Sequence, residues 1–465
     1  MKNDFRTSLL TIVPKKRTFA ASFIFCRDMR VFKFGGVSVV NPEAVRHIAR
    51  LIEENYTEPT VVVISAMGKM TNALEKLYQS SLKRKTVSIE TFESVKDFHL
   101  NIIRELFPFG QPQLEKDVFT LFHTMEKQLK KSIVHPSVYI DYKVYDFFYD
   151  QIVSIGELLS TKIMAAYLTH CGLPVVWCDA RKLIRTNNMF REGKVRWDTT
   201  VKNIKNRVPP LLDEGKLVLT QGFIGGNRNV TTTLGREGSD YSAAVFSFAL
   251  DASEMIIWKD VDGVLNADPK FFSDTKVLKY IPYEEAIELA YYGATVIHPK
   301  TIKPLENKNI PLRVKSFLNP KTEGSLIMRT PTVKPSIPSY IVKRNQVLVS
   351  ISPKDFSFIA EDKLSMIYGL FATLGMKSNL MQNSALSLCI CVDNQPLKLT
   401  ILKEKLHREF CVSIHRNLEL ITVRRFTEEV IHSVVEGRII VVEQRNKNTA
   451  QLVVPSLSDQ FQNNR

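Results

Sequence analysis

The stretch Arg30-Val31-Phe32-Lys33-Phe34-Gly35-Gly36-Val37-Ser38 is an apolar run that ends in two glycines, and the helix-start signal Asn41-Pro42 follows it. A strand, a glycine turn and a capped helix in this order predict the start of an α/β domain. The glycines let backbone N–H groups approach phosphate oxygens, and the helix N-terminus adds a favourable partial charge. An ordinary tight turn fits equally well, because the stretch is neither a Walker A loop nor a full dinucleotide fingerprint. Both interpretations stay open at this point.

The alternation of strands and helices continues to about residue 327, which predicts a mostly parallel sheet covered by helices. Five apolar runs have the pattern of strands buried on both faces: Val31–Phe34, Thr60–Ser65, Val175–Cys178, Leu217–Gln221 and Met255–Lys259. Residues 88–133 are predicted to form a helical hairpin broken at Pro108-Phe109-Gly110. The first large domain is therefore expected to span residues 29–328.

Prolines mark the end of this domain, at Pro331, Pro335 and Pro338. Beyond them, short strands alternate with short helices. This pattern predicts two smaller α+β modules, at residues 340–412 and 413–456, the second partly completed by flanking segments. A large α/β domain followed by two small modules is typical of a catalytic unit with a regulatory one.

The charge of the chain is informative mainly through its distribution. The 465 residues include 63 Lys+Arg and 48 Asp+Glu, a formal net charge of +15. Residues 1–30 contribute +5 of it, and elsewhere basic residues are mixed with acids and are not interleaved with aromatics as a base-stacking surface requires. We therefore expect no nucleic-acid partner, and the excess suits anionic small molecules. No apolar run approaches the roughly 18 residues of a membrane span, so no membrane partner is expected.

The first 28 residues are expected to be a disordered extension, because Met29 directly precedes the first convincing strand. A short apolar stretch, Phe19 to Phe25, follows three basic residues and leaves a targeting peptide as the alternative. The six cysteines form no CxxC pair, which favours reduced thiols and a cytoplasmic protein.

Two further segments carry side chains suited to small anions. Gly222–Gly226 follows a predicted strand, and Thr231–Asp240 then leads into a helix with one arginine, Arg236. A guanidinium group can fork a carboxylate, although Ser239 or Asp240 would also serve simply as the helix cap. The acidic loop Asp260–Lys270 lacks the terminal glutamate of an EF-hand, so a nucleotide contact is favoured over a metal loop.

Taken together, the motifs resemble those of the aspartokinases in the amino-acid kinase family. The resemblance runs from about Val31 to Val454 and rests on six segments in a fixed order: residues 33–39, 63–72, 154–157, 234–243, 260–270 and 292–299. It implies a three-layer sandwich with a mostly parallel sheet, followed by two ferredoxin-like ACT modules. It also implies transfer of the ATP γ-phosphoryl group to the β-carboxylate of L-aspartate, as the first step toward lysine, threonine and methionine.

The resemblance assigns roles to particular residues. Lys33 would stabilise the transferring phosphoryl group, and Asp240 would orient Lys33 rather than act as a base. The acceptor would be held by Glu157 through its ammonium, by Arg236 through its α-carboxylate, and by hydroxyls. These hydroxyl residues are Ser65, Thr71 and Ser239. The ATP positions are Lys33, Gly35, Gly36, Lys259, Asp260, Leu265, Lys270 and Thr295, with Mg²⁺ carried on the phosphates and no metal site of the protein's own.

Several residues depart from the commoner pattern of the family. Val37 and Leu265 replace a threonine and a tyrosine, and Glu237 stands where glycine is common after the arginine. Lys259 occupies a threonine position and Thr295 a lysine position, which predicts that the lysine has been relocated within the nucleotide pocket.

The resemblance of the tail to paired ACT modules implies an amino-acid effector and a homodimer or higher homo-oligomer. Asn379 replaces an aspartate expected to face the effector's ammonium, so the effector stays open between lysine, threonine and none. Two other functions are also considered. One is a superfamily enzyme acting on glutamate, acetylglutamate or UMP, and the other is an amino-acid-sensing protein with a degenerate kinase domain.

Overall fold

The computed structural model describes residues 28–456 apart from 57–58, 295–296, 356 and 436. The proposed extension at residues 1–28 therefore lies almost wholly outside the described residues, as does Thr295.

An eight-stranded sheet forms the centre of the first domain, in the order β3-β4-β2-β1-β7-β9-β10-β8. Neighbouring strands are parallel except β9 and β10. The strands are β1 (Arg30–Phe34), β2 (Thr60–Ile64), β3 (Val175–Cys178), β4 (Leu217–Gln221), β7 (Glu254–Lys259), β8 (Tyr280–Pro282), β9 (Leu312–Ser316) and β10 (Ser325–Met328). The mostly parallel sheet is confirmed, and its central strands are apolar because helices cover both faces.

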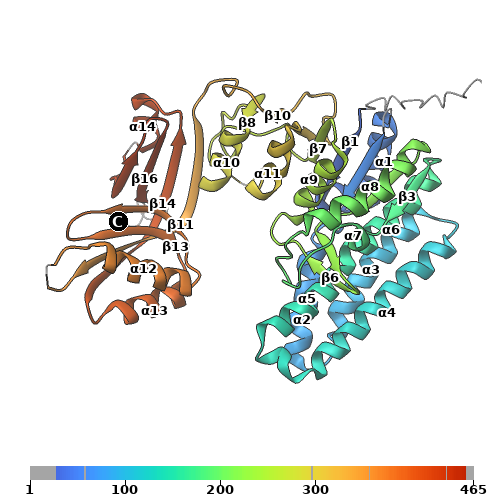
Figure 1. The fold of residues 1–465 in the computed structure, drawn as a ribbon, viewed down its shortest axis with the longest axis horizontal. Helices are drawn as coiled ribbons and strands as arrows, with labels where there is room; N and C mark the ends of the chain where they lie inside the picture. The colour runs from blue at the N-terminus through green and yellow to red at the C-terminus, as the bar shows by residue number, and fades with distance from the viewer. Residues whose placement is uncertain (1–27, 57–58, 295–296, 356, 436, 457–465) are drawn as a thin grey trace, which may run out of the picture.

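Two helical layers enclose this sheet, as expected for a three-layer sandwich (Figure 1). One layer contains α1 (Pro42–Asn55), α2 (Met70–Arg84), α3 (Ile89–Leu106), α4 (Pro112–Val134), α5 (Tyr142–Val153) and α6 (Ile155–His170). The other contains α7 (Ala180–Leu183), α8 (Trp197–Asp213), α9 (Gly238–Leu250), α10 (Tyr283–Tyr292) and α11 (Pro299–Lys308). A short hairpin of β5 (Ile224–Asn227) and β6 (Val230–Thr233) precedes α9.

The structure confirms the helix start predicted at Asn41-Pro42. Asn41 caps α1, because its Oδ1 accepts the backbone N–H of Ala44 at 2.8 Å, and Pro42 follows at the first helical position. The hairpin of α3 and α4 breaks between Leu106 and Pro112, which confirms the break predicted around Gly110.

One helical stretch, Tyr142–His170, is long and apolar enough to cross a membrane when judged by length and composition alone. It comprises α5 and α6, and 78% of its most apolar window is buried inside the fold. Its apolar side chains are therefore explained by packing against the sheet and the neighbouring helices.

A second, antiparallel sheet of six strands follows, in the order β12-β13-β11-β14-β16-β15. Its strands are β11 (Ser339–Pro353), β12 (Ser378–Asn383), β13 (Leu388–Asp393), β14 (Phe410–Arg424), β15 (Val442–Arg445) and β16 (Thr449–Pro455). The helices α12 (Glu361–Thr373), α13 (Pro396–Leu406) and α14 (Glu428–Val435) accompany it. This α+β tail agrees with the expected fold class.

The two long strands β11 and β14 pair along most of their length and run through both halves of this sheet. Strand β14 crosses the boundary expected between residues 412 and 413, so the two halves share strands. The division into modules at that point stays a prediction.

The second sheet contacts the first domain through α10, which lies between the two sheets in Figure 1. Glu285 on α10 forms ion pairs with Arg424 at 2.6 Å and with Arg425 at 2.5 Å. Glu285 and Arg424 are buried, and the two arginines hold the pKa of the Glu285 carboxyl below its ordinary value despite burial, which acts to raise it.

Candidate active site

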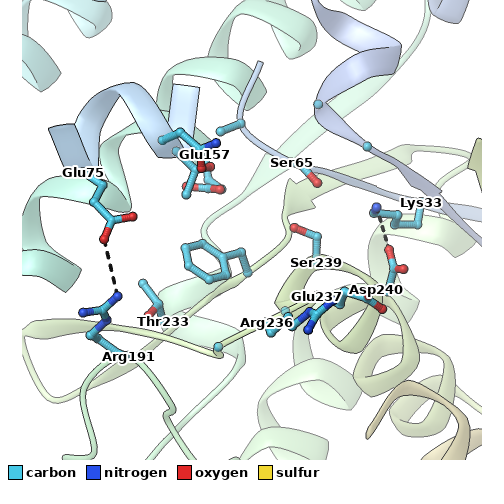
Figure 2. Close-up of a pocket in the computed structure, with 18 of the residues that line it drawn as sticks. Lys33, Ser65, Glu75, Glu157, Arg191, Thr233, Arg236, Glu237, Ser239 and Asp240 are labelled. Atoms are coloured by element: carbon cyan, nitrogen blue, oxygen red, sulfur yellow. Dashed lines mark ion pairs between the residues drawn. The ribbon is translucent and has the colours of Figure 1, made fainter. Parts of the chain in front are cut away.

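A cleft of about 700 Å³ opens at the carboxyl ends of β1, β2 and β4 and at the beginning of α9 (Figure 2). Ligands of open α/β sheets bind at this edge, because the loops after parallel strands converge there. Ten of the residues expected in the site line the cleft: Lys33, Gly35, Gly36, Ser65, Thr71, Glu157, Arg236, Ser239, Asp240 and Lys259.

Lys33 and Asp240 form a direct ion pair in this cleft, with Nζ and Oδ1 2.6 Å apart. Their side chains are 10% and 5% exposed. Side chains alternate along β1, so Phe32 and Phe34 pack into one helical layer while Lys33 points to the other, where the first turn of α9 presents Asp240. The pair thus combines residues more than 200 positions apart, and it places the Lys33 ammonium group in the lining of the cleft.

The two glycines of the first turn have different surroundings. A side chain at Gly36 would place its Cβ 2.6 Å from the carbonyl oxygen of Ala66 and closer still to that of Gly68. At Gly35 the nearest atom would be the Nζ of Lys33, at an ordinary 3.5 Å. Gly36 is therefore required for the close packing of two turns, whereas Gly35 faces the cleft.

Glu157, in the first turn of α6, is a buried acid that forms no ion pair with the described residues. It is 2% exposed, and its Oε2 atom has no hydrogen-bond partner among the described residues. Burial raises its pKa to about 8, although hydrogen bonds from the Ala66 backbone and the Thr71 hydroxyl act in the opposite direction. A buried acid of this kind is stabilised in its charged form by a positively charged ligand.

The loop before α9 adds Arg236, and the first turn of α9 adds Ser239, the remaining expected acceptor residues. Glu237 between them has a φ of 51°, in the left-handed region that favours glycine. Its Oε2 is also buried without a hydrogen-bond partner among the described residues. The structure therefore explains physically why glycine suits this position.

Only some of the residues expected to contact the nucleotide line the cleft. Lys259 lines the cleft, whereas Asp260, Leu265 and Lys270 lie on the loop after β7 and are not among its lining residues. Asp260 and Lys270 are exposed, and the Lys270 backbone N–H donates to Asp268. Thr295 lies outside the described residues.

Sequence reasoning missed several residues at one end of the cleft, among them Glu75, Tyr149 and Arg191. Glu75 lies four residues after Thr71 on α2, so helical spacing would have placed both on one face. Arg191 lies in an irregular loop with no periodicity to mark it. Among the described residues, no three His, Cys, Asp or Glu side chains form a cluster that could hold a metal ion.

Comparisons with known proteins agree with this geometry. Residues 28–316 match the Amino acid kinase family. Aspartokinase 1, chloroplastic, of Arabidopsis thaliana is 31% identical over 407 residues, which cover 85% of this chain and 68% of that protein. The chain thus spans about two thirds of the length of that relative.

A sequence and a crystal structure from Escherichia coli also match most of the chain. Lysine-sensitive aspartokinase 3 of Escherichia coli (strain K12) is 30% identical over 372 residues, or 79% of this chain and 78% of that protein. The crystal structure of E. coli aspartokinase III in complex with aspartate and ADP has a TM-score of 0.76 and 26% identity, and it covers 93% of this chain and 97% of the other.

Proposed function

This chain belongs to the aspartokinases of the amino-acid kinase family and is an ATP-dependent kinase, and on that premise we propose that it phosphorylates the β-carboxylate of L-aspartate. The product would be 4-phospho-L-aspartate, the first intermediate toward lysine, threonine and methionine. The observation that carries the proposal is that one cleft contains both a lysine cation and a buried acid that requires a cation. Lys33 supplies a cation at one end, and Glu157 requires one at the other.

The chemistry requires charge neutralisation more than proton transfer. A β-carboxylate with a reference pKa of about 3.9 is already ionised at neutral pH, so it needs no general base. Its approach to the ATP phosphates is opposed by repulsion between anions, and catalysis must come from positioning and nearby cations. Lys33 would neutralise charge on the transferring group, and Asp240, 2.6 Å away, would hold its ammonium in place.

The acceptor would lie along the cleft, and its ammonium and α-carboxylate groups would be bound by different residues. Glu157 would take the ammonium group, because a cation stabilises its buried carboxylate. Arg236 would form two hydrogen bonds with the α-carboxylate, and Ser65 and Ser239 would donate hydroxyl hydrogen bonds. Thr71, whose hydroxyl donates to Glu157, would lie beside the ammonium group.

ATP would enter beside Lys33 and Lys259, with Gly35 and Gly36 offering backbone N–H groups to the phosphates. Asp260, Leu265, Lys270 and Thr295 are proposed as outer contacts of the nucleotide. Mg²⁺ would ride on the phosphates, since that coordination needs no dedicated cage of protein carboxylates.

The test is acyl-phosphate formation, trapped as the hydroxamate, with ATP and Mg²⁺ and with aspartate, glutamate or acetylglutamate as acceptor. ADP release with UMP completes the comparison. We expect product with aspartate and none above background with the other acceptors, and its loss in Lys33→Ala. Activity with another acceptor only would favour a different superfamily enzyme, and no activity with any would favour a sensing protein.

We also propose an amino-acid effector at the second sheet. Asn379, expected near the effector, accepts a hydrogen bond from Lys343 at 2.9 Å and donates to Gln346 and Asp393. Its amide is thus held in a polar network. Adding lysine, threonine or methionine to the hydroxamate assay would identify the effector.

A homodimer or higher homo-oligomer in the cytoplasm is proposed as the working form. Sedimentation of the purified protein would test the assembly, and fractionation of cells would test the compartment.

A further inference from the structure

Arg191 reaches the cleft at the end away from the Lys33–Asp240 pair (Figure 2). Its backbone has a φ of 62°, in the left-handed region, and Asp150 holds it there. Both carboxylate oxygens of Asp150 accept the Arg191 backbone N–H, at 3.1 and 3.0 Å. Asp150 is fully buried and also accepts the backbone N–H and the hydroxyl of Thr233. The backbone of Arg191 is therefore fixed independently of its side chain.

The guanidinium of Arg191 lies between two acids. Its Nη2 is 3.6 Å from Oε1 of Glu75 and its Nη1 is 3.7 Å from Oδ1 of Asp146. Its charge also lies over the ring of Tyr149, 4.1 Å from the centroid. Arg191, on the loop between α7 and α8, thus neutralises two carboxylates, Glu75 on α2 and Asp146 on α5.

Glu75 lines the same cleft as Glu157, the carboxylate that we assign to the acceptor's ammonium. Thr71 and Glu75 are four residues apart on α2 and share a face of that helix. The Thr71 hydroxyl hydrogen-bonds Glu157, so Glu75 lies about one helical turn further along. An unneutralised charge there would oppose ionisation of Glu157, because like charges disfavour the charged form.

We propose that Arg191 is a positioning residue of the acceptor site, which neutralises Glu75 and Asp146 so that Glu157 can hold the acceptor's ammonium group in ionised form. This inference rests on the proposed function, since it takes the acceptor to be an amino acid. It assigns Arg191 no contact with the substrate. Its effect is electrostatic and acts through Glu157.

The matched variants are Arg191→Gln, which removes the charge and keeps a long polar side chain, and Arg191→Lys, which keeps the charge. For Arg191→Gln we expect the KM for aspartate to rise about tenfold, because one uncompensated like charge in a partly solvated cleft opposes the ionisation of Glu157. The kcat and the KM for ATP should change less than about twofold, because Lys33 and Lys259 are untouched. Arg191→Lys should stay within about threefold of the unmodified protein in all three constants.

A double variant separates electrostatics from simple loss of structure. Adding Glu75→Gln to Arg191→Gln removes the released charge and should restore most of the KM for aspartate. A structural defect would not be repaired by removing a second side chain. Lys162→Ala is the control, because Lys162 is likewise paired with an acid, Asp117 at 2.8 Å, and lies over an aromatic ring, Trp177, but does not line the cleft.

The outcomes distinguish this inference from the function on which it rests. Absence of aspartate phosphorylation in the unmodified protein overturns both. An active protein whose Arg191→Gln variant behaves as Lys162→Ala does, or whose double variant keeps the raised KM, overturns the role of Arg191 alone. If Arg191→Gln fails to fold, as judged by circular dichroism, while Arg191→Lys and the double variant also fail, the role is structural and the inference is wrong.

Discussion

Replacing Glu157 by glutamine should make the protein more stable at high pH while abolishing its acceptor site. Glu157 is 2% exposed, and burial raises its pKa to about 8 from an ordinary value of 4.5. The folded state therefore favours the protonated carboxyl. The stability that this provides is complete below pH 4.5 and is lost as the pH rises to about 8.

The size of the effect follows from the two pKa values. A loss of about 1.4 kcal/mol per pH unit between 4.5 and 8 amounts to about 5 kcal/mol in the ligand-free protein, as an order of magnitude. Glutamine has nearly the same shape and carries no charge at any pH. At pH 6 we expect the variant to be more stable than the unmodified protein by at most about 2 kcal/mol, and at pH 9 by several kcal/mol.

The assay is thermal unfolding of both proteins at pH 6 and pH 9. The change in the difference between their Tm values isolates Glu157, because all other titrating groups are common to both. Saturating aspartate at pH 9 should raise the Tm of the unmodified protein only, since its ammonium group supplies the missing cation. A Tm difference that is the same at both pH values would refute the reasoning.

Three further predictions concern the nucleotide end and the two loops. Lys259→Ala should raise the KM for ATP about tenfold with little change in that for aspartate, because one phosphate-facing cation is lost; an unchanged KM would contradict the relocated-lysine hypothesis. Gly36→Ala should destabilise the fold by at least about 3 kcal/mol in urea unfolding, because its Cβ would overlap the Ala66 carbonyl oxygen, whereas the control Gly35→Ala should cost less than about 1 kcal/mol. Glu237→Gly should stabilise the protein by about 1 kcal/mol, seen as a raised urea midpoint, because it relieves a left-handed backbone; a lowered midpoint would show that the carboxylate has a stabilising partner.

The centre of the cleft was predicted from the sequence because the resemblance to the aspartokinases singled out its residues and the local strand and helix signals fit them. Lys33 lies near the end of β1, Glu157 and Asp240 lie in the first turns of α6 and α9, and the carboxyl ends of parallel strands meet at one edge of the sheet. The mostly parallel sheet brings the three segments that contain these residues together in one cleft. The roles of these residues rested on that resemblance, and the local patterns alone left the glycine turn open between a phosphate loop and an ordinary turn.

The end of the cleft that contains Glu75, Tyr149 and Arg191 could not be predicted in the same way. Arg191 lies in an irregular loop, and its position depends on the buried Asp150 on helix α5. Strand β14 likewise crosses the module boundary expected between residues 412 and 413, because its first half has exposed residues and is held in place by pairing with β11. In both cases a long-range contact determines the structure, and no local pattern records it.

The contact of Glu285 with Arg424 and Arg425 affects how the chain could be shortened. A fragment ending in the proline-rich segment near residue 330 would keep the whole eight-stranded sheet but lose both guanidinium groups. Its Glu285 carboxyl would then lose the cations that hold its pKa down, on a helix face that the second sheet no longer covers. The first domain therefore depends on the second sheet for part of its own folding stability, and we expect the full chain to melt as one cooperative unit at a higher temperature than the isolated first domain.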